Sequence, residues 1–194
     1  MNDPGSANDD ARLIERSVSG DSEAFGRLVT RYQDRLYNSM VHYLRNETEA
    51  EDVVQETFIL AFTRLGSFQG KSAFYTWLYR IAFNTAISRG RRRRPRVSVE
   101  RDLLDAGTGL DGEGPQPGDQ LQQDERAAEL MAALGRLNQE HRAILVLREM
   151  DELSYEEISE ILETPVGTVR SRLHRARGQL KEELAGYFQS EPEH

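Results

Sequence analysis

The chain contains no cysteine among its 194 residues, which excludes disulfide bonds, thiolate zinc sites and cysteine nucleophiles. No apolar stretch approaches the roughly 18 residues that a membrane-spanning helix needs, so direct insertion into a membrane is not expected. The first sixteen residues are acidic and polar, and they lack the basic start and apolar core of a secretory signal. Together these absences predict a cytoplasmic protein.

The sequence also offers little for catalysis or metal binding. The segment Gly70-Lys71-Ser72 resembles the end of a phosphate-binding loop, but the preceding glycine, Gly66, is one residue too close. Helical patterns flank this segment, whereas a phosphate-binding loop follows a strand. The histidines are scattered without metal-ligand spacing: His42, His141, His174 and His194. We therefore expect no enzymatic activity, no catalytic residue, no metal and no cofactor.

Negative charge is missing from two long windows of the sequence. The net charge of −8 would oppose binding to nucleic-acid phosphates. Between Glu56 and Glu100, however, there is no acidic residue, and this window contains the run Arg91–Arg94. A second acid-free window, Thr164–Lys181, carries four arginines. The local charge therefore favours two nucleic-acid-binding surfaces in spite of the total.

Helical periodicity dominates the first half of the chain. Apolar residues recur at the spacing of one helix face within residues 23–44, 49–65 and 72–88. Thr48 to Glu51 fits a capping box at the start of the second of these helices. With an opening helix at about residues 10–19, the pattern predicts one helical domain over residues 1–95.

The pattern stops after Pro95. Residues 105–120, DAGTGLDGEGPQPGDQ, are rich in glycine, proline and acid and nearly free of large apolar groups, so they cannot bury enough surface to offset their ordering. We expect a flexible acidic linker over residues 96–124, and a second helical domain over residues 125–190. The predicted fold class is all-α, with two small helical domains and a helix-turn-helix in the C-terminal one.

The helix-turn-helix prediction rests on residues 153–180. Ser154 and Glu157 form a capping box on the first helix, while Thr164 suits the N-cap of the second and Pro165 its first helical position. The basic second helix is typical of a recognition helix. Four of its side chains share the face opposite the packing stripe and are candidates for reading bases: Arg170, Ser171, His174 and Arg175. Three others are placed for phosphates: Thr168, Arg172 and Arg177. The alternative is a solvated basic face on an ordinary helical bundle.

Aromatic and cationic side chains are interleaved from Phe68 to Arg96, a combination that suits single-stranded nucleic acid. Thr76, Arg80 and Asn84 recur every fourth residue and predict a polar stripe on the helix. For the large aromatic residues of this helix, such as Phe74 and Trp77, a place in the hydrophobic core is the stronger alternative.

With both segments in hand, the sequence resembles the extracytoplasmic-function sigma factors, the small members of the sigma-70 family, and in particular their sigma-E type. AEDVVQETFILAFTRLGSFQGKSAFYTWLYRIAFNTA carries the resemblance in the first domain, and LSYEEISEILETPVGTVRSRLHRAR carries it in the second. The resemblance implies a protein that binds core RNA polymerase and directs promoter-specific transcription initiation. Residues 1–95 would then be region 2, which recognises and melts the −10 element, and residues 125–190 region 4, which recognises the −35 element.

The resemblance also assigns residues to these tasks. Asp52, Gln55 and Glu56 would contact the clamp helices of the largest polymerase subunit, although such acids can also serve the positive end of their own helix. Six residues would bind the single-stranded −10 element: Phe68, Lys71, Tyr75, Trp77, Arg80 and Asn84. Among these, Asn84 would help to hold a flipped base. In the second domain, His174 stands where some relatives have an aromatic residue, and in the first, Gln69 stands where a basic residue is common.

The implied partners are promoter DNA, core RNA polymerase through the clamp helices and the flap of its second-largest subunit, and an anti-sigma factor. The acidic linker would stand in for nucleic acid in a basic channel of the polymerase. Two other interpretations stay open. A helix-turn-helix repressor or activator would act without polymerase and usually as a dimer on two half-sites, which leaves the first domain unexplained. An interaction scaffold leaves the basic windows unexplained.

Overall fold

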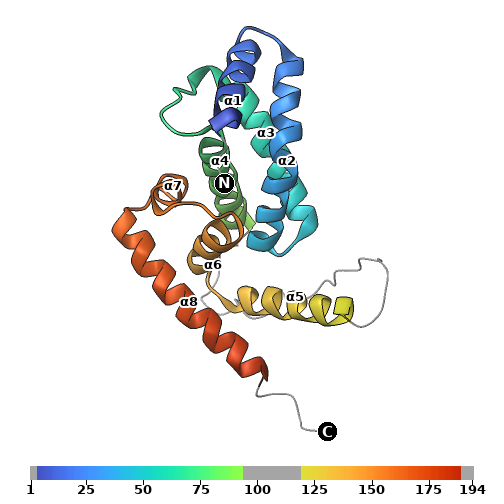
Figure 1. Cartoon of the computed structure of the whole chain (residues 1–194), viewed down its shortest axis with the longest axis vertical. Coiled ribbons are helices and arrows are strands. Elements are labelled where there is room, and N and C mark those ends of the chain that lie inside the picture. The colour runs from blue at the N-terminus through green and yellow to red at the C-terminus, as the bar shows by residue number, and fades with distance from the viewer. Residues whose placement is uncertain (1–3, 94–118, 189–194) are drawn as a thin grey trace.

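The computed structural model describes residues 4–93 and 119–188, and these residues form helices without any strand. The first domain consists of α1 (Pro4–Val18), α2 (Ser22–Leu44), α3 (Glu47–Arg64), the 3-10 turn η1 (Leu65–Ser67) and α4 (Phe74–Arg93). The second consists of α5 (Asp119–Arg136), α6 (Gln139–Leu145), the π-helical turn η2 (Val146–Met150), α7 (Tyr155–Ile161) and α8 (Val166–Phe188). The all-α prediction is confirmed (Figure 1).

Most of the expected linker, residues 94–118, lies outside the described part of the chain. Its far end differs from expectation, because α5 already begins at Asp119 and not at Glu125. Glutamine and glutamate are good helix formers, so a helix can start before the apolar stripe that periodicity detects. The domain limits 1–95, 96–124 and 125–190 otherwise stay predictions. Among the described helices, none is both long and apolar enough to cross a membrane.

The helix-turn-helix begins as its capping box predicts. The Ser154 hydroxyl accepts a hydrogen bond from the amide of Glu157, and the Glu157 carboxylate accepts one from the amide of Ser154. These two bonds satisfy amides that have no partner inside the helix. The side chains of Asp21 and Asn138 cap α2 and α6 in the same manner, each with a single bond.

Two other predicted caps are wrong. The cap of α3 is Asn46, whose side chain accepts from the amide of Glu49, so the helix starts before the box expected at Thr48. The Thr164 hydroxyl donates to the carbonyl of Leu162, 3.0 Å away, and does not cap α8. Helix α8 begins at Val166, so Pro165 precedes its first helical residue, and the Pro165 carbonyl accepts a hydrogen bond from the amide of Val169.

One hydrophobic cluster runs through both domains. Leu36 of α2 and Phe83 of α4 belong to it together with Ile144 of α6 and Leu147 of η2, and all four are fully buried. Burying one such side chain stabilises the fold by roughly 1.5–3 kcal/mol. Helices α6 and α7 accordingly lie against α2 and α4 (Figure 1). The two domains are therefore packed on each other, which the sequence did not lead us to expect.

Arg142 of α6 forms hydrogen bonds to both domains. Its guanidinium donates to the carbonyls of Leu134, Gly135 and Leu137 at 2.9 to 3.0 Å, and to that of Tyr43 at 3.0 Å. The first three carbonyls lie at the C-terminal end of α5, where the last carbonyls of a helix have no partner within the helix. Arg142 supplies donors to them. The fourth belongs to α2. Burial is the main cause that lowers the pKa of Arg142, and the positive charge of Arg45 adds to it.

Replacing Arg142 by methionine keeps an apolar stem and removes all these donors. Hydrogen bonds from charged groups contribute roughly 1.5–3 kcal/mol each, and buried acceptors left unpaired add a penalty. We expect Arg142→Met to lower the free energy of unfolding by about 3 kcal/mol, measured by urea denaturation followed by circular dichroism. The control is Arg27→Met, which removes an exposed pair with Glu23. Such a pair is worth about 0–1 kcal/mol, so equal losses in both variants would contradict the role of Arg142.

Candidate nucleic-acid interface

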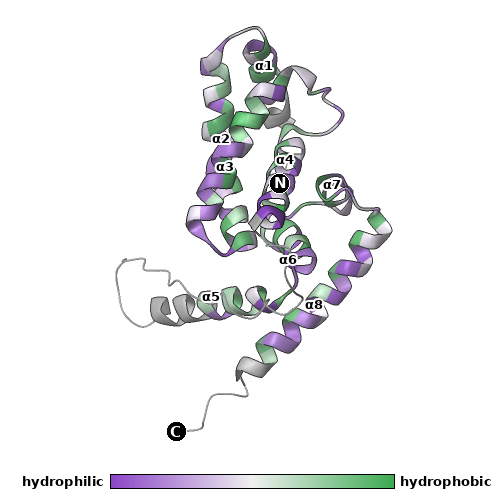
Figure 2. Ribbon diagram, turned by 180° about the vertical axis from the view of Figure 1, so that it is seen from behind, coloured by the Kyte–Doolittle hydropathy of each residue, from purple (hydrophilic) through white to green (hydrophobic). Residues whose placement is uncertain are grey.

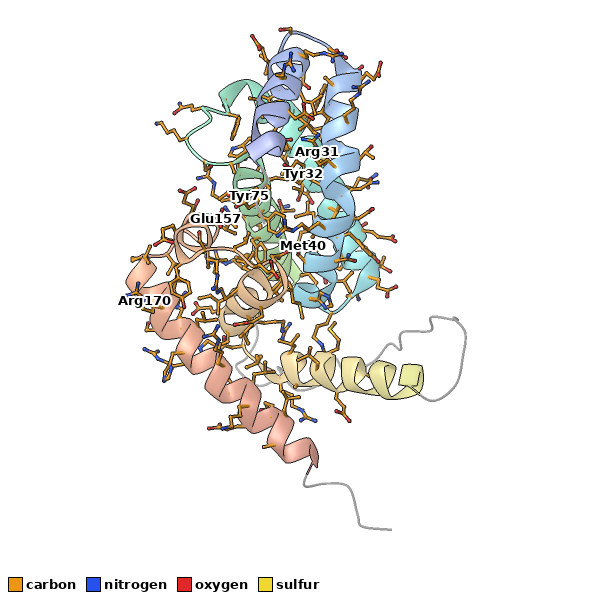
Figure 3. The ribbon with its side chains drawn as sticks, viewed as in Figure 1. Arg31, Tyr32, Met40, Tyr75, Glu157 and Arg170 are labelled. Atoms are coloured by element: carbon orange, nitrogen blue, oxygen red, sulfur yellow. The ribbon has the colours of Figure 1, made fainter. Side chains whose placement is uncertain are left out.

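Helix α8 presents the predicted base-reading side chains on one outer face. Val169, Leu173 and Ala176 are buried against α6 and α7. Because these residues face inward, four others face solvent, and all are exposed: Arg170, Ser171, His174 and Arg175. The Arg170 guanidinium lies over the ring of Tyr155 of α7, 5.7 Å from its centroid, at the N-terminal end of α8 (Figure 3).

The predicted phosphate contacts lie around this face, and two of them have intramolecular partners. Arg172 lies 3.2 Å from the Glu140 carboxylate, and Arg177 lies 2.7 Å from that of Glu149. Exposed ion pairs contribute only about 0–1 kcal/mol, so either arginine can exchange its carboxylate for a phosphate. Thr168 is half-buried in the first turn of α8, where the helix N-terminus favours anions. Figure 2 shows the alternation of hydrophilic and hydrophobic residues along this helix.

The candidates for single-stranded DNA differ in accessibility. Lys71 and Asn84 are exposed, and Phe68 and Arg80 are half-buried. Trp77 is only 9% exposed, and its ring packs against those of Phe68 and Phe74 at centroid distances of 5.2 and 5.7 Å. Phe74 and Trp77 therefore belong to the core, as the alternative interpretation had it.

The polar stripe expected on α4 is only partly present. Thr76 is 2% exposed and its hydroxyl has no hydrogen-bond partner among the described residues, Arg80 is half-buried, and Asn84 is exposed. A helix has 3.6 residues per turn, so positions four apart drift by about 40° at each step. Over two steps the stripe turns from the core to solvent. Asn84 is thus the accessible end of the predicted stripe.

Arg89 of α4 forms ion pairs with the two acids that are predicted to bind polymerase. The Arg89 guanidinium lies 2.5 Å from Asp52 and 2.9 Å from Glu56. Hydrogen bonding to Glu56 is the first cause that raises the pKa of Arg89, and Asp52 adds to it. The dipole of a helix acts mainly within its first turn, and Asp52 and Glu56 lie further along α3. Interaction with the dipole of their own helix therefore does not explain why Asp52 and Glu56 are acidic. Gln55, between them on α3, is exposed.

The sequence interpretation missed two apolar residues on the same face of α3. Ile59 is 59% exposed and Phe62 is 51% exposed. They follow Asp52, Gln55 and Glu56 at helical spacing. The Phe62 ring rests edge-on against Phe25, with centroids 5.0 Å apart. The periodicity of α3 already leaves both residues off its buried stripe, so the signal was available. Exposed apolar groups beside polar ones are typical of a protein-binding face.

Comparison with known proteins identifies the family. Residues 28–96 match the family model "Sigma-70 region 2", and residues 127–180 match "Sigma-70, region 4". The chain is 42% identical to the RNA polymerase sigma-H factor of Pseudomonas aeruginosa, over 90% of this chain and 93% of that protein. The chain belongs to the sigma-70 family. The sigma-E type is represented by the ECF RNA polymerase sigma-E factor of Escherichia coli, which is 43% identical over 87% of this chain and 90% of that protein.

Solved structures agree with this assignment. CnrH in complex with the cytosolic domain of CnrY has a TM-score of 0.69 at 28% identity, covering 92% of this chain and 98% of that chain. The sigma factor RpoE of Bartonella quintana, in complex with the anti-sigma factor NepR, has a TM-score of 0.62 at 26% identity, covering 83% and 96%.

The predicted function class is confirmed. The protein is an RNA polymerase sigma factor of the extracytoplasmic-function type, which binds core polymerase and promoter DNA and is not an enzyme. The interpretation as a repressor acting without polymerase is set aside, because the match to region 2 accounts for the first domain.

Proposed function

We propose that this sigma factor reads its promoters with two surfaces, the outer face of α8 on the −35 duplex and the segment from Phe68 to Asn84 on the melted −10 strand. The observation that carries the proposal is the exposed face of α8. Its side chains are oriented by the buried Val169, Leu173 and Ala176, and no acid interrupts the helix before Glu182. An α-helix fits the major groove, where arginine pairs with guanine and serine accepts or donates at several bases.

On the −10 surface, we expect the side chains that are accessible in the structure to contact the single DNA strand. Asn84 carries an amide that can bond the edge of a flipped base, and Lys71 and Arg80 supply positive charge for its phosphates. Among the aromatic candidates, Phe68 is half-buried while Tyr75 and Trp77 are buried, and a base can stack on a ring only where the ring is accessible.

Core polymerase would dock on two further faces. The face of α3 that carries Asp52, Gln55, Glu56, Ile59 and Phe62 suits the clamp helices of the largest subunit. In the second domain, an open groove of about 530 Å³ is lined by Leu145, Leu180 and Leu184, and it suits an apolar segment of the flap of the second-largest subunit. Because the sigma factor RpoE of Bartonella quintana was solved in complex with an anti-sigma factor, an anti-sigma factor is proposed for this chain as well. We propose a cytoplasmic location for the sigma factor, because it works on DNA.

The test is transcription in vitro with sigma-free core polymerase on fragmented genomic DNA. We expect discrete transcripts whose start sites define the promoters. One base contact is worth roughly 1–3 kcal/mol, so Asn84→Ala should lower transcription about 5- to 150-fold. Gln33→Ala, which removes another exposed amide, on α2, should leave transcription unchanged. Full transcription by the Asn84→Ala variant would remove this residue from the −10 site.

A further inference from the structure

One aromatic ring of the second domain contacts two guanidinium groups. Tyr155 is the first residue of α7, directly after the N-cap Ser154. The Arg148 guanidinium of η2 lies over the Tyr155 ring, 5.3 Å from its centroid, and the Arg170 guanidinium of α8 lies over the same ring at 5.7 Å. A cation within about 6 Å of an aromatic centroid is attracted by the ring. Tyr155 therefore joins a side chain from the turn before α7 to one from α8.

The ring of Tyr155 is itself held in place. Tyr155 is half-buried and packs against the hydrophobic cluster. Arg148 is half-buried as well, and its guanidinium donates to the carbonyl of Leu153 at 2.7 Å. This hydrogen bond closes the segment between η2 and α7, and Tyr155 follows two residues after Leu153. Because these residues and Arg170 all belong to the second domain, the contacts among them lie within one domain.

Arg170 differs from the other arginines of the outer face of α8 in what it contacts. Arg172 and Arg177 are paired with carboxylates. Arg170 and Arg175 form no ion pair within residues 4–93 and 119–188, so their donors are available to DNA. Of these two, only Arg170 lies over a ring in the described part of the chain. One of the two proposed base-reading arginines is therefore oriented before DNA is bound.

Stacking on a ring and reading a base use different parts of a guanidinium. The group is flat, its face stacks on aromatic rings, and its five N–H donors lie along its edge. Guanine presents N7 and O6 in the major groove, and an arginine bonds both of them with its edge. Arg170 can therefore keep its face on Tyr155 while its edge pairs with a guanine.

We infer that Tyr155 is a positioning residue for −35 recognition, whose ring orients the guanidinium of Arg170 toward the bases while Arg148 steadies the ring. A long side chain loses rotational freedom when it binds, and this loss weakens the complex. Arg170 has given up part of this freedom in the free protein, whereas Arg175 is ordered only by the DNA. The inference rests on the proposed function, because it names what orients one base-reading side chain of α8.

The variants that test the inference are Tyr155→Leu and Tyr155→Phe. Leucine keeps an apolar group against the hydrophobic cluster and removes the ring, whereas phenylalanine keeps the ring and removes only the hydroxyl. The matched control is Tyr37→Leu, because Tyr37 is also half-buried beside the cluster but belongs to α2. Tyr155→Met, which fills more of the volume of the ring, replaces the leucine variant if that variant does not fold.

Each variant is combined with core polymerase, and the affinity of the holoenzyme is measured by anisotropy for two labelled promoter fragments. One fragment carries a −35 sequence mapped by transcription, and the other differs only in a scrambled −35 element. The ratio of the two affinities measures −35 reading, since the −10 element is the same in both. Ordering one long side chain accounts for an affinity change of about 2- to 10-fold. We therefore expect Tyr155→Leu to lower the ratio about 2- to 10-fold, Tyr155→Phe to restore it, and Tyr37→Leu to leave it unchanged.

A double-mutant cycle distinguishes positioning from a general structural role. In the Arg170→Ala background, Tyr155→Leu should lower the ratio no further, because the side chain that it orients is gone. In the Arg175→Ala background, the effect of Tyr155→Leu should persist. A residue that only supports the fold would lower the ratio in both backgrounds.

The outcomes separate this inference from the proposed function. If Arg170→Ala lowers the ratio and Tyr155→Leu does not, the ring does not orient Arg170 and the inference alone is wrong. If Tyr155→Leu still lowers the ratio in the Arg170→Ala background, or if Tyr155→Phe is as weak as Tyr155→Leu, Tyr155 acts on DNA or on the fold directly, which also overturns the inference. If Arg170→Ala itself leaves the ratio unchanged, the proposed −35 surface loses this residue and the inference fails with it.

Discussion

Replacing Arg170 and Arg175 together by alanine is expected to lower the affinity for −35 duplex DNA by at least about 30-fold and to abolish −35-dependent transcription. Each bidentate arginine–guanine pair is worth roughly 1–3 kcal/mol. The two residues lie on successive turns of α8, both exposed, with no acid beside them on the helix. Their losses should therefore nearly add. Affinity is measured by anisotropy with a promoter duplex and with a scrambled duplex.

The control for this experiment is the double variant in which Arg172 and Arg177 are replaced by alanine. These side chains form ion pairs with Glu140 and Glu149 beside the base-reading face. A phosphate contact carries no sequence information, so their loss should weaken both duplexes alike and reduce the salt slope by about one for each residue. If the two double variants behave identically on promoter and scrambled DNA, α8 does not divide base reading from phosphate binding as proposed.

The sequence was informative wherever the determinants of structure are local. Ser154 and Glu157 lie three residues apart and cap α7 as predicted, and the stripe of Val169, Leu173 and Ala176 determines which face of α8 is exposed. Helical periodicity of this kind needs no knowledge of the rest of the fold. It located the helix-turn-helix and the helices of the first domain, although cap positions and the start of α5 shifted.

The contacts between the domains could not be predicted in this way. Ser39 and Asp151 are 112 residues apart in the chain, and Tyr79 and Asp151 are 72 apart. An isolated serine on a helix and an aspartate after a helix have no spacing pattern that reveals a partner. The resemblance to sigma factors assigned Tyr75 to DNA, but only the structure shows its hydroxyl bound to Glu157. Side-chain accessibility therefore separates residues that the sequence treated as one set.

The face of α3 is where we expect the largest effect on polymerase binding, in the variant Phe62→Asp. An aromatic group at the centre of an interface typically contributes about 2–4 kcal/mol, which corresponds to a 30- to 700-fold weaker complex with core polymerase. Phe62 suits this role because its ring is half exposed while its edge is held against Phe25, so little side-chain freedom is lost on binding. Competition against a labelled sigma factor for core polymerase measures the effect.

Val18→Asp is the matched control, since Val18 is 56% exposed but belongs to α1. Ile59→Asp provides a second substitution on α3 that does not touch Phe25 in any described ring contact, and its thermal unfolding should match that of the wild type. We expect both α3 variants to lose core binding while retaining affinity for −35 duplex, because α8 is unchanged. If Phe62→Asp and Ile59→Asp compete as well as Val18→Asp, polymerase does not dock on the apolar part of α3. The acids Asp52 and Glu56 would then have to supply the contact alone, and binding would fall steeply with salt, since interactions between exposed charges are screened.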